Sequence, residues 1–410
     1  MIYVLNNNGN PLMPTSRHGK VKHLLRDGKA KVVKKTPFTI QLLYETTSYL
    51  QPITLGVDAG SKTVGISATT TEKELFASEA TLRNDIVDLL STRRANRRTR
   101  RNRLRYRQPR FLNRTASKAD GWLAPSIQQK INSHLKVVEE VYKILPISSL
   151  VIETASFDIQ KIKNPDINGE QYQQGAQLAF WNVREYVFFR DHHECQHCHG
   201  KSKDKILNVH HLESRKTGGD APENLITLCE TCHGLYHNGL IILKVKRGTS
   251  FRDAAFMGIM RWAVYNRLKE LYPHVSLTYG YITKNSRISH NIEKTHSADA
   301  FCISGNLSAK RSNTVYLQTF KRKHNRQIHK ANILKGGQKK FNQAAYKVKG
   351  FHLFDKVTYN GEACFIFGRR TSGYFDLRKL DGTVVHRSAI YKDLVLLERQ
   401  KTLLTERKVG

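Results

Sequence analysis

The sequence predicts a mixed α/β chain of several domains, and three observations support this. Apolar strands at 53–58 and 149–153 each end in an acidic residue, and helical segments lie between them. A block at 195–237 combines two Cys-x2-Cys pairs with a His-His pair. Residues 351–398 alternate apolar and polar side chains with glycines at turns, which is typical of a small β-barrel. At 410 residues, the chain has room for two to four compact units.

The composition predicts binding to nucleic acid. Lys and Arg number 68 against 34 Asp and Glu, which leaves a net charge of +34. A positive field of this size favours polyanions and speeds the encounter with them. Cys302 and Cys364 stand alone in the sequence, as expected in a reducing compartment. No apolar run reaches the roughly 20 residues of a membrane span, and we see no signal-peptide pattern. We therefore expect a cytoplasmic, nucleoid-associated prokaryotic protein without membrane contact.

The N-terminal region predicts a small module followed by a hairpin. Residues 1–54 contain Asn-Pro-Leu-Met-Pro at 10–14, a basic helix-like stretch at 17–27 and a strand at 38–44. The apolar strand 53–58 is followed by a Gly-Ser-Lys turn and a second strand at 63–68.

Residues 93–114 contain eleven arginines and no acid. A helix here has almost no apolar stripe, and its like charges at i and i+4 repel each other. Solvated charged faces normally mix signs, so we expect an anionic partner to compensate. Arg suits bidentate phosphate contacts and stacking on bases. We predict that nucleic acid is bound by Arg93, Arg94, Arg97, Arg98, Arg100, Arg101, Arg103, Arg105, Arg107, Arg110 and Arg114.

The remaining elements follow from apolar periodicity. A linker is expected at 116–126, and a basic segment free of acids covers 300–354. Helices are expected at 127–144, 175–190 and 252–271, and a further segment at 290–304 carries His-Ser-Ala-Asp.

One group of residues predicts metal-dependent phosphodiester hydrolysis. Asp58 and Glu153 each close an apolar strand, so neighbouring strands can bring them together. His296 and Asp299 are spaced i and i+3, which places them on one helix face. Carboxylates around two cations activate water and stabilise the leaving oxygen. An acid after a strand is more often a turn or cap residue, so the prediction of a hydrolytic site depends on all four residues together.

A second group combines zinc-binding and catalytic residue types. Cys195, Cys198, Cys229 and Cys232 form two Cys-x2-Cys pairs that suit a closed tetrahedral Zn2+ site. Four cysteines alone favour a zinc ribbon without chemistry. His210 and His211 lie between the pairs, and His233 and His237 are spaced i and i+4. These histidines favour a catalytic role, since a neutral imidazole suits a base at neutral pH.

Two family resemblances follow. The set Asp58, Glu153, His296 and Asp299 resembles the split RuvC nuclease, which has an RNase H-like fold. Residues 195–237, with Gly-Gly-Asp at 218–220 and Pro-Glu-Asn-Leu at 222–225, resemble the HNH or ββα-metal nucleases.

The HNH resemblance implies roles for five residues. His211 is the general base, and His210 binds the catalytic metal. His237 is the second metal ligand and His233 a candidate third, while Asn224 orients the loop that holds the base. The implied cofactors are catalytic Mg2+ at both nuclease sites and structural Zn2+ at the cysteines.

The order of these segments resembles the IscB family of transposon-associated, RNA-guided nucleases. The resemblance implies an RNase H-like RuvC core split in three, an inserted HNH domain and an arginine-rich bridge helix. The implied domains are an N-terminal module (1–54), the first RuvC segment (55–92), the bridge helix (93–115), the second RuvC segment (116–188), HNH (189–245), the third RuvC segment (246–305) and a small basic C-terminal β domain (306–410).

The resemblance also implies partners. A monomer binds a structured guide RNA that pairs with one strand of double-stranded DNA; HNH cuts that strand and RuvC the displaced one. The protein reads a short flanking motif, and Arg369, Arg370 and Arg378 are candidate contacts. Two alternatives stay open: a protein-guided homing or junction-resolving endonuclease, and an inactive RNA-binding regulator of a transposon. RNA dependence of cleavage separates the RNA-guided nuclease from the protein-guided endonuclease, and any metal-dependent cleavage excludes the inactive regulator.

Overall fold

The computed structural model describes residues 1–104, 122–154, 182–215, 219–243, 252–322 and 345–409. The chain is a mixed α/β protein of several domains, as predicted. It divides into two compact units, the first made of Met1–Thr154 with Met260–Gly410 and the second of Ala155–Ile259. Within the described ranges, the helices are all too short or too polar to cross a membrane.

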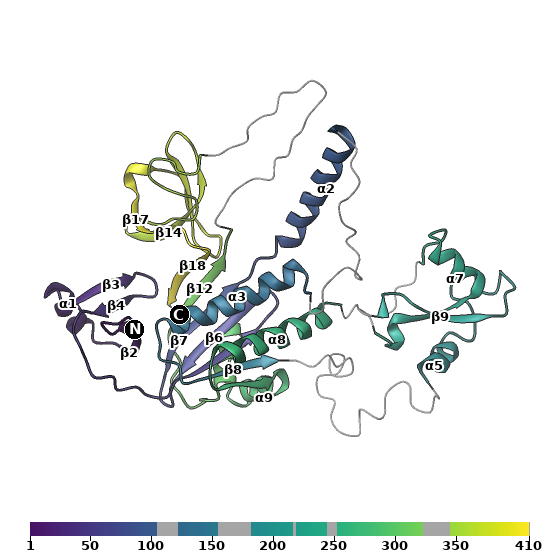
Figure 1. Ribbon diagram of the computed structural model, residues 1–410, viewed down its shortest axis with the longest axis horizontal. Helices are drawn as coiled ribbons and strands as arrows, with labels where there is room; N and C mark the ends of the chain where they lie inside the picture. The colour runs from purple at the N-terminus through teal and green to yellow at the C-terminus, as the bar shows by residue number, and fades with distance from the viewer. Residues whose placement is uncertain (105–121, 155–181, 216–218, 244–251, 323–344, 410) are drawn as a thin grey trace. The chain divides into compact units, whose positions relative to one another are not determined.

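A seven-stranded mixed sheet forms the centre of the first unit, in the order β11-β8-β5-β6-β7-β12-β18 (Figure 1). The predicted hairpin is present, since β5 and β6 pair antiparallel, and β7 continues the antiparallel run. On the other side, β8 pairs parallel with β5, and β11 pairs parallel with β8. The strands are β5 (Thr54–Ala59), β6 (Thr63–Thr69), β7 (Glu74–Thr81), β8 (Ser149–Thr154), β11 (Val275–Tyr279), β12 (Thr314–Phe320) and β18 (Leu403–Val409).

Two long helices pack on this unit close to where the sequence predicts them. α3 (Pro125–Tyr142) begins at a proline, whose fixed φ suits the first helical turn. Its buried apolar residues Ile127, Ile131, Val138 and Val141 follow one another at spacings of four, seven and three, which is the pattern of a core-facing stripe. α8 spans Arg252–Leu271, and the ring of Tyr272, just after it, stacks on Tyr142 at 3.9 Å. α3 and α8 both run across the sheet in Figure 1.

A third helix, α10 (His296–Ser304), lies unusually close to β5 and β6. A Cβ atom at Gly56 would lie 2.0 Å from the Ala300 carbonyl oxygen, and one at Gly65 would lie 1.9 Å from the His296 carbonyl oxygen. Only glycine therefore permits this approach. The helix start is fixed by Thr295, whose hydroxyl accepts a hydrogen bond from the Ala298 amide at 3.0 Å.

The N-terminal module forms its own four-stranded sheet but packs against the central one. Tyr3 is almost fully buried, and its hydroxyl donates to the Leu75 carbonyl at 3.0 Å. The Tyr3 ring meets Phe76 edge-on, and Phe76 stacks on Tyr316. The sheet order is β2-β1-β4-β3. The elements are β1 (Ile2–Leu5), β2 (Pro11–Thr15), α1 (His18–Arg26), β3 (Ala30–Lys34) and β4 (Thr39–Leu42).

The C-terminal range 306–410 is divided between two sheets. β12 and β18 pair with each other and extend the central sheet at β7, so they cover its edge. The intervening strands form a five-stranded antiparallel sheet in the order β16-β15-β14-β13-β17, with β16 and β17 as its edges. The alternation of apolar and polar residues at 351–398 therefore does form strands. These strands make an open sheet with two edges, and not the small β-barrel that the sequence predicts. Its strands are β13 (Lys356–Tyr359), β14 (Glu362–Arg369), β15 (Tyr374–Arg378), β16 (Val384–Ile390) and β17 (Val395–Glu398).

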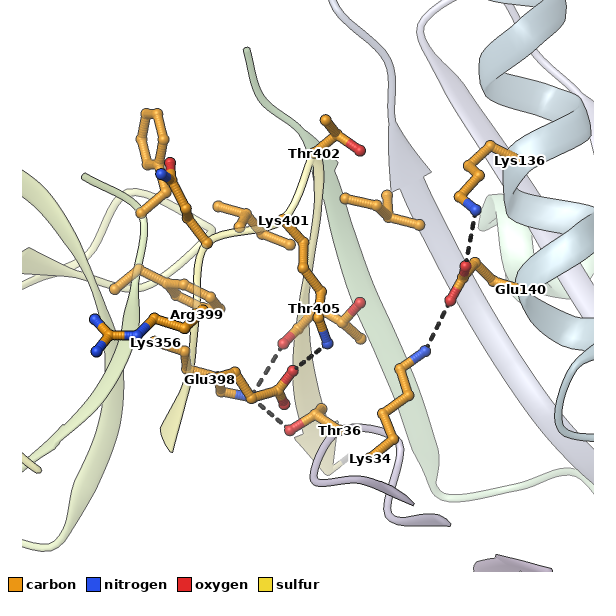
Figure 2. Close-up of a pocket in the computed structure, with 15 residues that line it drawn as sticks. Lys34, Thr36, Lys136, Glu140, Lys356, Glu398, Arg399, Lys401, Thr402 and Thr405 are labelled. Atoms are coloured by element: carbon orange, nitrogen blue, oxygen red, sulfur yellow. Dashed lines mark hydrogen bonds and ion pairs between the residues drawn. The ribbon is translucent and has the colours of Figure 1, made fainter. Parts of the chain in front are cut away.

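A cavity of about 290 Å3 lies where the two smaller sheets approach the central one (Figure 2). Lys356 is buried beside it, and its ammonium donates to the Thr36 hydroxyl at 2.7 Å and to the Thr405 carbonyl at 3.1 Å. On the other wall, Glu140 of α3 accepts from Lys34 at 3.0 Å. The hydrogen bonds of Lys356 thus connect the N-terminal module and the five-stranded sheet to the central sheet, and the Lys34–Glu140 ion pair connects the N-terminal module to α3.

The second unit is small and held by polar contacts. β9 (Leu207–His211) and β10 (Leu225–Cys229) form an antiparallel pair between α5 (Val183–Arg190) and α7 (Glu230–His237). Arg190 donates to the Leu225 carbonyl at 2.8 Å, and the buried Asp191 accepts from the Thr227 amide at 2.9 Å. The helix predicted at 175–190 is thus observed as α5, and 175–181 lie outside the described residues.

His134 on α3 predicts a pH dependence of stability. The side chain is fully buried, and burial lowers its pKa from 6.5 to about 4, although the Lys130 carbonyl, 2.8 Å from Nδ1, opposes the shift. Between pH 6.5 and about 4, His134 is therefore protonated in the unfolded chain and neutral in the folded chain. The unfolding free energy falls as the pH is lowered through this range. We expect this group to remove about 2 kcal/mol of unfolding free energy between pH 7 and pH 5.

The measurement is the urea unfolding free energy of the first unit at both pH values, compared between the natural chain and His134→Asn. The variant keeps an amide donor in place of Nδ1 and does not titrate. Equal pH dependence in both chains contradicts the prediction. His290→Asn, at an exposed histidine, is the matched control.

Candidate functional site

Asp58 and Glu153 lie side by side at the ends of two neighbouring parallel strands. Val57 of β5 pairs with Ile152 of β8, so the next residue on each strand carries one of the two carboxylates. Both acids are buried, with 6% and 8% of their surface exposed. Gly56 and Asp58 share one face of β5 because side chains alternate along a strand. That face is the one covered by α10.

α10 brings the other two predicted residues to this place. Nδ1 of His296 lies 2.6 Å from Oδ2 of Asp58, a contact between residues 238 positions apart in the sequence. Asp299 is one helical turn further on and half-buried. The structure therefore gathers the four residues at one place.

Basic side chains that the sequence analysis missed balance these acids. Arg261 of α8 lies 3.2 Å from Oε1 of Glu153 and donates from Nε to the Ala59 carbonyl at 2.9 Å. Arg287 of α9 (Gly280–Ser289) lies 3.0 Å from Oδ1 of Asp299. No short-range spacing links these arginines to the acids, so only the fold reveals the pairs.

The pKa shifts of the site residues show how closely their charges are placed. Burial raises the pKa of Glu153; Arg261 opposes the shift and the nearby Asp58 adds to it. Burial and then Asp58 raise the pKa of Asp299. The hydrogen bond to Asp58 raises the pKa of His296. Crowded carboxylates of this kind are stabilised by a cation.

The residues of the first unit fit Mg2+, because carboxylate oxygens are its preferred protein ligands. In the part of the chain that the structure describes, however, the four residues do not place three ligand atoms within 4.8 Å of one another. Arg261, Arg287 and His296 occupy the carboxylate oxygens instead.

Glu79 of β7, which the sequence analysis did not identify, supports the helix that carries His296. Its Oε1 accepts hydrogen bonds from the amide and the hydroxyl of Ser297, each at 3.0 Å. A carboxylate is favourable at a helix N-terminus. Glu79 thus fixes the first turn of α10, which carries His296.

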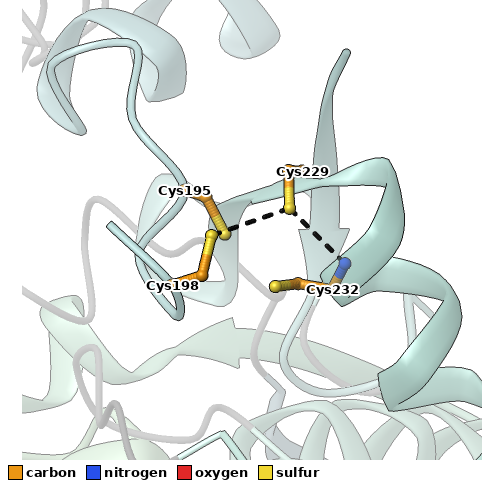
Figure 3. Close-up of side chains that lie close together, drawn as sticks. All are labelled: Cys195, Cys198, Cys229 and Cys232. Atoms are coloured by element: carbon orange, nitrogen blue, oxygen red, sulfur yellow. Dashed lines mark hydrogen bonds between the residues drawn. The ribbon is translucent and has the colours of Figure 1, made fainter. Parts of the chain in front are cut away.

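The second unit contains a cluster of four cysteines (Figure 3). The four sulfur atoms lie within 4.8 Å of one another, and those of Cys198 and Cys229 are 3.8 Å apart. Sulfur atoms about 2.3 Å from a tetrahedral Zn2+ are spaced by a similar distance, about 3.8 Å. Cys195, Cys229 and Cys232 are buried. The residues therefore fit a structural zinc ion, as predicted.

Three histidines form a second cluster in this unit. His210 of β9 and His233 and His237 of α7 bring one ring nitrogen each within 4.8 Å. The ring centroids are 4.6 to 5.1 Å apart. Burial, and then the neighbouring imidazoles, lower the pKa of His210 to about 4, so its ring is neutral at neutral pH. These are nitrogen donors, and Mg2+, which prefers oxygen, does not fit them.

His211 points away from that cluster and contacts an acid. Its Nε2 lies 2.9 Å from Oδ1 of Asp220, and Arg215 holds the other oxygen of Asp220 at 2.6 Å. The hydrogen bond from His211, and then Arg215, lower the pKa of Asp220. Asp220 lies inside the Gly-Gly-Asp motif, but its sequence distance from His211 does not signal the pair.

Asn224 closes the loop between β9 and β10. Its Oδ1 accepts from the Glu213 amide at 2.8 Å, and its Nδ2 donates to the carbonyls of Glu213 at 3.0 Å and Gly219 at 2.8 Å. The side chain is buried, with 8% exposed. It can therefore position the loop that carries Asp220 and, through Asp220, the His211 ring.

The arginine-rich segment begins in a helix, α2 (Ile86–Leu104). Arg93, Arg94, Arg97 and Arg98 are exposed on it. Arg100, Arg101 and Arg103 belong to the helix, but their side chains lie outside what the structure describes. The remaining predicted contacts, which lie outside the described residues altogether, are Arg105, Arg107, Arg110 and Arg114.

Comparison with known families matches two regions of the chain. Residues 195–239 match the family described as HNH endonuclease. The second unit contains an HNH endonuclease domain. The cysteine and histidine clusters both lie in this domain.

Residues 2–175 match the family described as RRXRR protein. The run 97–101 reads Arg-Arg-Thr-Arg-Arg, in agreement with that description. No curated protein matches the chain.

The similar solved structures include two of Streptococcus thermophilus Cas9. The one in complex with the AGAA PAM has 14% identity over 45% of this chain and 26% of its own, with a TM-score of 0.28. The one with the GGAA PAM has 15% identity over 49% and 29%, with a TM-score of 0.29. The chain thus spans little more than a quarter of the length of these structures.

The close approach of α10 predicts the effect of Gly65→Ala. The added methyl group meets the backbone of α10, which must shift and take His296 away from Asp58. Overpacking of this kind costs about 1–3 kcal/mol of unfolding free energy, measured in urea for the first unit. Gly19→Ala is the matched control, because no atom lies within 4 Å of a Cβ at that helical position. An unchanged stability in Gly65→Ala would disprove the packing argument.

Proposed function

We propose that this chain is an RNA-guided DNA endonuclease of the IscB type that cuts the two DNA strands at two separate sites. The observation that carries the proposal is the presence of two hydrolytic residue sets. An HNH domain lies in the second unit, and a cluster of carboxylates with a histidine lies at strand ends in the first. Two strands of opposite polarity require two cuts, and one site for each strand satisfies that requirement.

In the HNH site, His211 is the proposed general base. When its Nε2–H donates to Asp220, Nδ1 is left unprotonated and accepts a proton from the attacking water. Asp220 holds the ring in that tautomer, and Asn224 holds the loop. His210 faces α7 on the opposite side of β9, so the base and the histidine cluster occupy different faces of one strand.

In the first unit, a RuvC-like site split along the sequence accounts for the gathering of distant residues. Asp58 comes from the first RuvC segment, Glu153 from the second, and His296 and Asp299 from the third. The mixed sheet, with three antiparallel strands followed by two parallel ones, supports an RNase H-like core. Bound Mg2+ supplies activation of water and stabilisation of the leaving oxygen. Asp58, Glu153 and Asp299 are the residues that would hold it.

The proposed guide is a structured RNA, and α2 is the proposed bridge helix. Its exposed arginines present guanidinium groups that suit phosphate oxygens. The five-stranded sheet is the proposed reader of a DNA motif beside the target. There, Arg378 is held by Asp376 at 2.6 Å and Arg370 contacts the Ser388 hydroxyl at 2.9 Å. These contacts orient the guanidinium group of Arg378 at the end of β15 and that of the exposed Arg370 just after β14.

The two-site proposal predicts which strand each variant cuts. Asp58→Ala removes a proposed metal ligand, so it nicks only the guide-paired strand. His211→Ala removes the base, so cutting of the paired strand slows about 10²–10⁴-fold while the displaced strand is still cut. Each strand is labelled separately and followed on a denaturing gel. His192→Asn, at an exposed histidine of the second unit, serves as the control. If Asp58→Ala still makes double-strand breaks, the RuvC-like assignment is wrong.

The test of RNA guidance is to express the chain with its native flanking locus, purify it through high salt and sequence the RNA that stays bound. A discrete RNA with one variable end and a structured remainder supports the proposal and supplies the guide for cleavage assays. Random fragments, together with cleavage that needs no RNA, would instead support a protein-guided endonuclease.

A further inference from the structure

The cavity of the first unit is lined by side chains from the N-terminal module, from α3 and from the C-terminal range (Figure 2). It contains none of the residues of the two proposed cleavage sites. Its volume is about 290 Å3, and sites for small molecules measure about 300–1,000 Å3. The cavity is therefore large enough for one small ligand, such as a single nucleobase.

The charges around this cavity do not balance. The lining cations are Lys34, Lys136, Lys356, Arg399 and Lys401, and the lining acids are Glu140 and Glu398. Glu140 is paired with two of these lysines and Glu398 with one, at 2.8 to 3.1 Å. Arg399 contacts a third acid, Asp355, at 3.1 Å. Five cations against three acids leave a surplus of positive charge, which attracts an anion.

Lys356 of β13 has no ion pair within the part of the chain that the structure describes. The residue is only 7% exposed, and its ammonium donates to two neutral oxygens, the Thr36 hydroxyl and the Thr405 carbonyl. An ammonium has three N–H donors. Burial lowers the pKa of Lys356, and Glu398 opposes the shift. Because a buried charge without an ionic partner costs free energy, a ligand that supplies an acceptor is favoured here.

The cavity also offers an acceptor that lacks a donor. Oε2 of Glu398 accepts from Lys401 at 2.8 Å, whereas its Oε1 is buried and has no hydrogen-bond partner among the described residues. A nucleobase carries N–H donors and acceptor atoms on one planar ring, so it can serve both Glu398 and Lys356. Phe354 and Leu403 line the same space, and aromatic side chains stack on bases of any sequence.

The mouth of the cavity suits a phosphate group. Arg399 and Lys401 line the cavity and keep 52% and 53% of their side-chain surface exposed, so the cavity reaches solvent beside them. Guanidinium and ammonium groups both bind phosphate oxygens. We propose that this cavity binds one nucleotide, with the base between Lys356, Glu398 and Phe354 and the phosphate at Arg399 and Lys401. The nucleotide is either free or part of a bound RNA, and the experiment separates these two sources.

The first test uses the full chain, freed of RNA at high salt and returned to physiological salt. Binding of the four nucleoside monophosphates is measured by titration calorimetry. We expect one nucleotide per chain for at least one of the four. The matching nucleoside and ribose phosphate should each bind about tenfold more weakly or worse, because each lacks one half of the contacts, and a stacked base or a charged hydrogen bond contributes about that factor.

The matched variants each remove one ammonium and keep the length of the side chain. Lys356→Met and Lys401→Met should weaken nucleotide binding about tenfold or more. Lys392→Met, at an exposed lysine outside the cavity, should bind like the natural chain. Thermal unfolding checks that Lys356→Met is folded, and Lys401 is half-exposed, so its replacement disturbs little packing. The proposal is overturned if ribose phosphate binds as tightly as the nucleotide, or if either cavity variant keeps its affinity.

The second test identifies the source of the nucleotide in the complex purified with its RNA. If a nucleotide of the RNA fills the cavity, the complex does not bind the free nucleotide, and irradiation crosslinks the RNA to the peptide that contains Phe354. If the complex binds the free nucleotide as the RNA-free chain does, the ligand is a free nucleotide. The first test needs neither guide nor cleavage, so its failure overturns this site alone, while loss of guided cleavage overturns only the proposed function.

Discussion

The contact of α10 with β5 and β6 is the constraint on which the site of the first unit depends. Backbone atoms of the helix occupy the space where side chains of Gly56 and Gly65 would stand. The helix is thereby brought near enough for His296 to bond Asp58 at 2.6 Å. Glu79 then fixes the rotation of the first turn through Ser297. Two residues without side chains thus allow α10 to bring His296 and Asp299 to the carboxylates of Asp58 and Glu153.

The two units balance charge in different ways. In the first, acids at strand ends are crowded and buried, and guanidinium groups from α8 and α9 compensate for them. In the second, the metal-binding candidates are imidazole and cysteine side chains, and the charged pair of Asp220 and Arg215 lies at the surface.

The sequence predicts helices and strands well where apolar residues recur at helical spacing or form a short continuous run. The strands around Asp58 and Glu153, and helices α3 and α8, follow from apolar runs and caps, and the cysteine and histidine spacing located both clusters of the HNH domain. Long-range pairs were not predictable. Nothing in the spacing joins Arg261 to Glu153, or β12 to β7, because these contacts depend on tertiary packing. The C-terminal range was therefore expected to be one domain, although β12 and β18 complete the central sheet.

The parallel pairing of β8 with β11 has a consequence for how such a chain can change over time. Parallel neighbours need a long crossover in any case, and here the crossover includes the whole HNH domain followed by α8. A segment in that position can be lengthened, exchanged or lost while the register of the sheet stays the same, provided that α8 still returns the chain to β11. The fold thus offers a place where the HNH domain can be gained or lost while the carboxylate site of the first unit is kept.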